Sequence, residues 1–276
     1  MRTTFEEDFG PEKVRIETQQ VLSNRCEVMS RITGPREDSP GPGLELILFS
    51  RQIFVEKSRH GGHFCIETDL AGSSVSILQT MQPTGKFELP ITKRIIQQTL
   101  LGLRYLHDTG NIVHTGMLLG PVLDSWVANL GTDLKSGNVL VMFGSVSGTS
   151  EYDNTIARYL ETHPSTSYEP KFAPELSPDP IITVRSEPLP DFELHSSFKN
   201  IHVRISDFGS GSWDLLANAL TSTYLISAIP VEHIDPDLSV QPTALRAPEV
   251  IIGHPWSKPI DICSIGCMVR LLVLLS

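Results

Sequence analysis

The chain has 276 residues, of which 40% are apolar, so it can bury a core and is not a disordered tail. Its 22 Lys and Arg against 32 Asp and Glu give a net charge of −10, which argues against a dominant role in binding nucleic-acid phosphates. An acidic surface suits basic peptides, and the alternative is that it serves only solubility.

The cysteines and the amino terminus indicate a reduced, intracellular protein. Cys26, Cys65, Cys263 and Cys267 are too few and too scattered for a disulfide framework or a paired zinc motif. Cys263 and Cys267 are expected to share one helical face as two packed core thiols. The charged amino terminus lacks an apolar signal core, and no apolar run approaches the roughly 20 residues of a membrane helix.

The first third of the chain predicts a helix, a loop and two strands. Residues 1–10 are acidic and carry no Gly-rich phosphate loop, and residues 14–32 are compatible with a helix that contains Glu27. Three prolines make residues 34–43 a loop. Residues 44–55 and 63–66 then predict strands, and the second strand leads into a turn at residues 67–72.

From Thr92 the sequence predicts an amphipathic helix that starts beside Pro90. Apolar or small residues recur at three- and four-residue steps, and we expect this stripe to be core: Ile95, Ile96, Thr99, Leu100, Leu103 and Leu106.

Three short motifs follow in a fixed order. Asp133, Lys135 and Asn138 provide a carboxylate, an ammonium and a carboxamide at spacings that fit a tight loop able to orient a hydroxyl, neutralise a phosphate and hold a metal ion. Residues 201–206 alternate as a strand and deliver Asp207 in Asp-Phe-Gly, and residues 247–249 read Ala-Pro-Glu. Each motif alone is weak, but their order indicates phosphoryl-transfer chemistry.

With these motifs the chain resembles a eukaryotic protein kinase, and the fungal type of the SR-protein-specific kinase (SRPK-like) family in particular. The resemblance is carried by residues 95–107, by Ile-Val-His-Thr at 112–115 and by residues 241–253. It implies an α+β, protein kinase-like fold, with an incomplete small N-lobe of strands plus one helix at residues 1–71 and a partial, mainly helical C-lobe at residues 72–276. We expect this fold to be truncated at both ends and the apolar residues 271–275 to be uncovered.

The resemblance also implies the roles of the site residues. Asp133 would act as the base, Lys135 would offset charge on the transferred phosphoryl group, and Asn138 and Asp207 would hold Mg2+ against ATP. Lys13, paired with Glu27, would position the other phosphates.

Further residues of the family pattern would bind the adenine or order the site. The backbone of Asp69 to Ala71 would form the hinge that meets the adenine edge, after Thr68 at the gatekeeper position. His114 would pack beneath the Asp-Phe-Gly motif, and Thr243 would bridge toward the catalytic loop. A helix starting near residue 256 would carry two more roles: Asp261 would tie down the catalytic loop, and Cys263 would occupy a core position where the family has Trp. Glu249, just before it, would pair with an Arg later in the fold.

Two segments depart from the family pattern, and a third, Pro-rich segment resembles a spacer of the fungal relatives. The family runs His-Thr-Asp without interruption, whereas this chain carries an insert at residues 115–131 and a second at residues 214–230. We interpret both as retained introns or another error of gene prediction, with variant loops of a real protein as the alternative. The first insert would let Asp133 move, and a misplacement of about 1 Å can cost roughly a hundredfold in rate. The Pro-rich residues 145–200 are predicted to form a loop-like spacer.

The function implied is an ATP-dependent serine/threonine protein kinase whose protein substrates are Arg/Ser-rich, as splicing factors are. We expect a monomer, cytoplasmic or nuclear or both, without direct nucleic-acid or membrane binding. The alternatives are a catalytically impaired pseudokinase or binding module, and a mis-predicted gene fragment.

Overall fold

The computed structural model describes residues 32, 42–58, 61–114, 117–119, 134–143, 150–174, 178–185, 189–190, 194, 197–208, 224–226, 229–231, 241 and 245–273. Four of the predicted site residues lie outside these ranges: Lys13, Glu27, Asp133 and Thr243. The helix predicted at residues 14–32 lies outside them as well, except for Ile32.

An antiparallel hairpin of β1 (Ser50–Ser58) and β2 (Gly61–Thr68) forms the first described sheet. The strand predicted at 63–66 lies within β2, but the strand predicted from residue 44 is wrong at its start, where a short 3-10 helix, η1 (Leu44–Leu46), precedes β1. Gly43 explains the difference. Its φ of 113° is open to glycine, and a Cβ there would come within 2.6 Å of the Leu101 carbonyl oxygen. The chain can therefore turn tightly against the helix that carries Leu101.

A three-stranded antiparallel sheet lies next in the fold, with the order β3 (Ala71–Ser74), β6 (Val139–Met142) and β7 (Val203–Ile205). Val139 pairs with Ile205 and Val141 with Val203, and these four side chains are buried. The intervening residues are half-buried, which is the alternation expected when one face of a sheet is covered. The strand predicted at residues 201–206 is thus confirmed.

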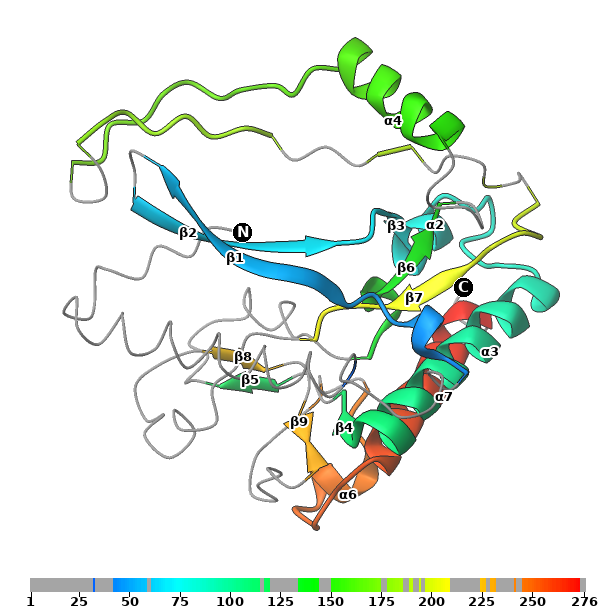
Figure 1. The fold of residues 1–276 in the computed structure, drawn as a ribbon. Helices are drawn as coiled ribbons and strands as arrows, with labels where there is room; N and C mark the ends of the chain where they lie inside the picture. Colours follow the sequence, from blue (N-terminus) through cyan, green and yellow to red (C-terminus); the bar gives the residue numbers. More distant parts are fainter. Residues whose placement is uncertain are drawn as a thin grey trace.

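Two long helices pack together beside this sheet (Figure 1). These are α3 (Leu89–Tyr105), which continues into a π-helical turn, η2 (Leu106–Gly110), and α7 (Pro259–Val273). A shorter helix, α2 (Val75–Thr80), follows β3 and is capped by the Ser74 hydroxyl, which accepts the Ile77 N–H at 3.3 Å.

The predicted apolar stripe of α3 is largely confirmed. Ile95, Thr99, Leu103 and Leu106 are buried, but Leu100 is 39% exposed, so its assignment to the core is wrong. Gly102 and Tyr105 are buried instead, because the buried face of α3 is shifted by one position from the predicted stripe.

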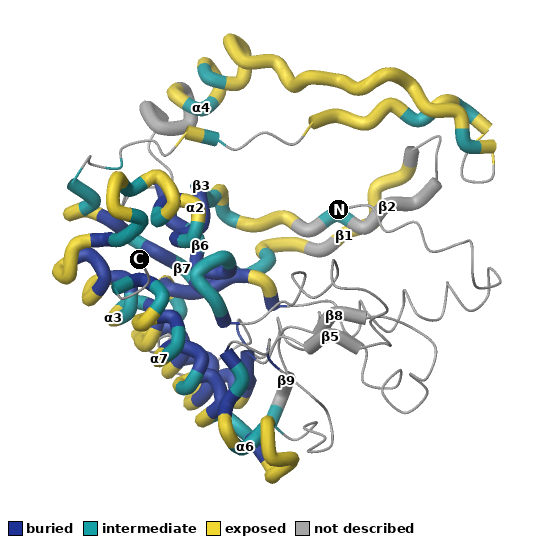
Figure 2. The backbone as a smooth tube through the Cα atoms, turned by 180° about the vertical axis from the view of Figure 1, so that it is seen from behind, coloured by how far each residue is buried: buried dark blue, intermediate teal, exposed yellow. Residues whose placement is uncertain are grey.

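The core is shared by α3, α7 and the sheet, where the buried residues gather in Figure 2. It includes Ile47, Leu103, Ile205, Ile265, Met268 and Leu272. The expectation that residues 271–275 are uncovered is therefore wrong at Leu272, which is fully buried. The Leu271 carbonyl is also bound, since it accepts a hydrogen bond from Gln79 Nε2 at 2.9 Å.

The segment predicted as a loop-like spacer contains a helix, α4 (Ser150–Thr162). Beyond it, residues 166–171 and 181–185 run antiparallel, and Lys171 and Ile181 exchange backbone hydrogen bonds of 2.9 and 2.8 Å. In both views this arm stands away from α3 and the three-stranded sheet, and most of its residues are exposed (Figures 1 and 2). The prediction of a loop throughout this segment is wrong. Apolar residues do recur at helical spacing before the prolines, at Ile156, Tyr159 and Leu160, but the many prolines that follow favoured a loop in the prediction.

Two short strand pairs join distant parts of the chain. β4 (Ile112–Val113) pairs with β9 (Ile229–Pro230), and β5 (Met117–Leu119) pairs with β8 (Tyr224–Ile226). The second pair places the two family-atypical segments side by side. The last helix before α7 is the short α6 (Pro248–Ile251). None of the helices in the described ranges is long and apolar enough to span a bilayer. The α+β class is confirmed.

Two leucines on α3 test this packing. Leu103→Ala should lower the free energy of unfolding by about 2–5 kcal/mol, because it leaves a cavity in the core. Leu100→Ala, the matched control on the exposed side, should cost about 0.5 kcal/mol or less. Urea unfolding followed by circular dichroism would measure both, and equal losses would contradict the observed orientation of α3.

Candidate active site

The ends of β6 and β7 bring two predicted site residues to one edge of the sheet. Asn138 closes a 3-10 turn, η4 (Ser136–Asn138), directly before β6. Its backbone oxygen accepts hydrogen bonds from the Ser206 N–H and the Ser206 hydroxyl, both at 2.9 Å. Asp207 follows immediately after Ser206, so a carboxamide and a carboxylate come from adjacent strand ends. Asn138 is buried and Asp207 is exposed.

The loop that carries Lys135 is tight. The Lys135 carbonyl accepts the Asn138 N–H at 2.9 Å, and Leu134 is fully buried beneath it. Asp133 precedes Leu134 in the chain but lies outside the described residues. Asp207 has φ of 66°, a left-handed conformation that non-glycine residues adopt mainly where the surrounding structure imposes it.

His114 lies beneath the segment that ends in Asp207. Its ring meets the Phe208 ring edge-on, with centroids 5.4 Å apart, and both side chains are buried. Its Nε2 lies 3.0 Å from the Ser206 carbonyl oxygen. A carbonyl only accepts, so this contact requires the proton on Nε2. His114 thereby contacts both neighbours of Asp207, the Ser206 carbonyl and the Phe208 ring.

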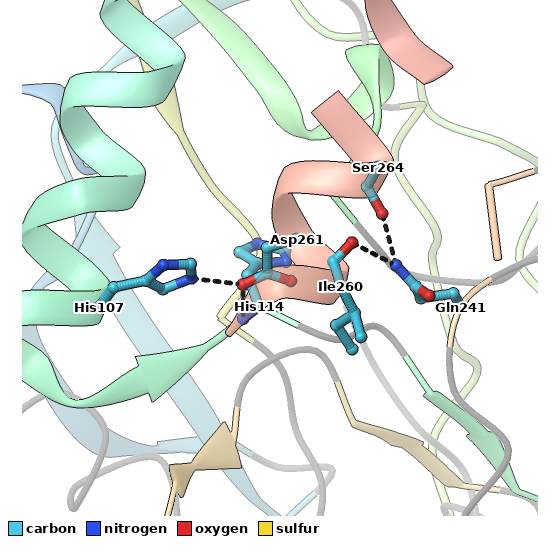
Figure 3. A network of polar contacts seen from close by, with 6 residues as sticks. All are labelled: His107, His114, Gln241, Ile260, Asp261 and Ser264. Atoms are coloured by element: carbon cyan, nitrogen blue, oxygen red, sulfur yellow. Dashed lines mark hydrogen bonds and ion pairs between the residues drawn. The ribbon is translucent and has the colours of Figure 1, made fainter. Parts of the chain in front are cut away.

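Asp261, in the first turn of α7, anchors His114. Its fully buried carboxylate oxygen Oδ2 accepts the His114 backbone N–H at 2.7 Å and lies 2.8 Å from His107 Nε2 (Figure 3). A buried carboxylate needs such donors to offset its lost hydration. One side chain of α7 therefore fixes the end of η2 and the end of β4 together.

Gln241 is a buried residue to which the sequence assigned no role. Its Nε2 donates to the Ile260 carbonyl at 2.8 Å and to the Ser264 hydroxyl at 2.7 Å (Figure 3). Its Oε1 accepts the Ala247 N–H at 2.9 Å. Its own carbonyl accepts from Arg246 Nη2 at 3.0 Å. This amide connects the segment before α6 with the first turns of α7.

Glu249 and Cys263 are two further predicted residues, one in α6 and the other in α7. Glu249 lies in the first turn of α6 and is half-buried, and no ion pair involves it within the described part of the chain. Cys263 is half-buried beside Cys267, so the core position expected for it, and for the thiol pair, is wrong. Burial and then the neighbouring Cys267 and Glu249 raise the pKa of the Cys263 thiol, which favours its neutral form.

Asp69 and Ala71, which were predicted to form the hinge, lie just after β2 and at the start of β3. Ala71 starts β3, and the Thr68 hydroxyl donates to the Asp69 carbonyl at 3.0 Å. The Asp69 carboxylate forms ion pairs with Arg51 of β1 and Arg204 of β7. Burial alone would raise the pKa of Asp69, but hydrogen bonds and charge from the two arginines outweigh it and lower the pKa. The sequence predicted a role only for the backbone of this segment, and it predicted none for Arg51 or Arg204.

The donor set at the edge of β6 and β7 fits a hard divalent cation. The Asn138 carboxamide and the Asp207 carboxylate offer oxygen atoms, the ligands that Mg2+ prefers. Across the described ranges no group of three or more His, Cys, Asp and Glu side chains forms a metal cluster. Mg2+ is commonly bound by one or two carboxylates together with substrate phosphates and waters, and this donor set is compatible with that arrangement.

A hinge before β3, a tight loop before β6 and a carboxylate after β7, anchored through His114 to Asp261, define an incomplete protein kinase fold. No protein-family model matches the chain. The serine/threonine-protein kinase SRPK of Physarum polycephalum is 27% identical over 78% of this chain and 42% of its own length. Protein kinase dsk1 of Schizosaccharomyces pombe is 24% identical over 82% of this chain and 48% of its own length.

A third relative, dual specificity protein kinase KNS1 of Saccharomyces cerevisiae, is 26% identical over 82% of this chain and 22% of its own length. The chain spans less than half the length of each of these curated relatives. The chain is thus similar to protein kinases of the SRPK type and to related dual-specificity kinases.

Gln241 offers a test of the contacts to α7. Gln241→Leu keeps the volume but removes the three contacts of the side chain and leaves the buried Ala247 N–H without its acceptor, so we expect a loss of about 1–3 kcal/mol in the free energy of unfolding. Ser264→Ala removes only one of the three contacts and should cost about 1 kcal/mol. Urea unfolding measures both; a neutral Gln241→Leu would show that the network does not stabilise the fold.

His202 gives the fold a pH dependence. Burial and then the charge of Arg204 lower its pKa below 6.5, against an opposing effect of Glu45, with Arg94 adding to the decrease. The unfolded chain therefore binds this proton more readily, and stability should fall as the pH drops below about 6.5. His202→Gln should flatten the change in urea midpoint between pH 7.5 and 5.5, whereas the exposed His163→Gln should not.

Proposed function

We propose that the protein transfers the γ-phosphate of ATP to a serine or threonine hydroxyl of a protein substrate. The observation that carries this proposal is the junction of Asn138 with Ser206, which sets Asn138 and Asp207 at one edge of the sheet. The named activities of the relatives support it. Phosphoryl transfer depends mainly on positioning and electrostatic stabilisation, so such a prearranged edge is what the reaction needs.

The proposed roles follow the chemistry of each side chain. The substrate hydroxyl oxygen bonds to the γ-phosphorus, the bond from that phosphorus to the ADP oxygen breaks, and the hydroxyl proton passes to Asp133. Lys135 offsets negative charge on the phosphoryl group. Asn138 and Asp207 would hold Mg2+, which when bound neutralises charge on the phosphates.

Other predicted residues complete the proposal away from the reacting atoms. Lys13 paired with Glu27 would position the remaining phosphates, and the backbone of Asp69 to Ala71 would receive the adenine. Thr243 would bridge toward Asp133 and Lys135, and Glu249 would pair with an Arg later in the fold. The proposed substrates are Arg/Ser-rich proteins, because of the resemblance to SRPK-like kinases, and the net charge of −10 is compatible with cationic partners.

A second candidate is a nucleotide-binding module that does not transfer phosphate. One observation favours it: β5 lies in the segment that separates His114 from Asp133, and it pairs with β8. In the family pattern a single Thr separates the His from the Asp, so the anchor of the loop and the proposed base are further apart in sequence here.

A magnesium-dependent transfer assay with labelled ATP and an Arg/Ser peptide separates the two. Asp133→Asn and Asp207→Asn should each lower the rate by about a hundredfold or more, because each removes a charge needed in the transition state. Asp108→Asn, which removes only an exposed carboxylate paired with Arg104, is the control.

The same proteins should be titrated with a fluorescent ATP analogue. Binding without transfer in the wild-type protein would favour the module, and absence of both would overturn the kinase proposal. A rate that persists in Asp133→Asn and Asp207→Asn would overturn the assigned roles.

A further inference from the structure

We propose that the side chain of Asp69 is a positioning residue, which fixes the hinge backbone through its ion pairs with Arg51 and Arg204 and so sets the affinity for the nucleotide. This inference rests on the proposed function, because it assumes that the adenine binds along residues 69–71. It adds a role for the Asp69 carboxylate itself, in addition to that of the backbone.

Three separate elements meet at this carboxylate. Asp69 lies between the last residue of β2 and the first residue of β3. Its Oδ2 accepts from Arg204 Nη1 at 2.5 Å, and its Oδ1 pairs with Arg51 Nη2. Arg51 belongs to β1 and Arg204 to β7. One side chain thus joins the first hairpin, the hinge and the three-stranded sheet.

The pair with Arg204 connects strands that share no backbone hydrogen bonds. In the sheet order β3-β6-β7, β6 separates β3 from β7. The contact from Asp69 to Arg204 therefore spans the middle strand at the hinge end. β7 also leads directly to Asp207, so a shift of Arg204 relative to the hinge would change where the adenine site lies relative to the proposed metal site.

The two arginines contribute unequally. The side chains of Asp69 and Arg204 are only 16% and 18% exposed, whereas that of Arg51 is 56% exposed. A pair in low dielectric is screened little, while an exposed pair is worth much less. Arg204 Nε has no hydrogen-bond partner in the described part of the chain, so Arg204 depends strongly on the carboxylate. Arg204 is therefore the main partner, and Arg51 the weaker one.

Asp69→Asn in the full chain tests the proposal, because it keeps the shape and removes the charge. Two measurements are made: hydrogen exchange of the hinge amides by mass spectrometry, and the Kd of a fluorescent ATP analogue with Mg2+. We expect exchange of residues 70–71 to rise about tenfold and the Kd to rise about tenfold, since small displacements of a binding segment weaken binding by such factors. In the transfer assay the KM for ATP should rise more than kcat falls.

Matched variants keep the result interpretable. Arg204→Met should reproduce the effect and Arg204→Lys should restore part of it, while Arg51→Met should have a smaller effect. Asp108→Asn, which removes an exposed carboxylate paired with Arg104, should change neither hinge exchange nor Kd.

Two results would overturn the proposal. The first is unchanged hinge exchange and nucleotide affinity in Asp69→Asn. The second is faster exchange spread over the whole molecule with unchanged affinity, which would show a purely structural ion pair. If the wild-type protein binds no nucleotide, the proposed function fails and the adenine role fails with it, while the exchange data still decide whether Asp69 fixes the hinge.

Discussion

The buried carboxylate of Asp261 is the contact on which the candidate site depends. It holds the His114 backbone N–H and lies against His107, and His114 in turn contacts Phe208 and the Ser206 carbonyl. Asp207 is thereby linked to α7 through a short series of buried contacts. A charge without solvent is tolerated only while its donors stay in place, so this arrangement resists partial loosening. The first turn of α7 is thereby joined to the segment that carries Asp207.

Much of the fold could be predicted because its signals are local. The apolar stripe on α3 and the alternation of apolar and polar residues in β7 indicate which side of each element packs against the core. Both patterns are confirmed in the structure. The failures have tertiary causes. Gly43 makes η1 possible through its close approach to α3, and the exposure of Leu100 follows from how α3 is rotated against its neighbours. Neither cause can be recognised from the residues nearby in sequence.

The residues of the candidate site also fall into those that local motifs predicted and those that depend on tertiary contacts. Asn138 and Asp207 were predicted from motif spacing, and the structure brings their backbones together. His107, Gln241, Arg51 and Arg204 received no role, because each acts through a partner distant in sequence. A buried glutamine or arginine carries no local pattern that distinguishes it from a solvated one. His107 and Gln241 were the nearest to being found, since each stands at one end of a string of residues that carries the family resemblance.

The pairing of β6 with β7 also explains how the fold accommodates the arm that contains α4. The Met142 N–H donates to the His202 carbonyl at 2.8 Å, so the chain leaves and re-enters the sheet at neighbouring points. Arg94 and Gln98 of α3 secure the return by binding the Ile201 carbonyl. The entropy of closing a longer excursion rises only with the logarithm of its length. Evolution can therefore lengthen, shorten or replace this excursion while the framework beneath it keeps its register.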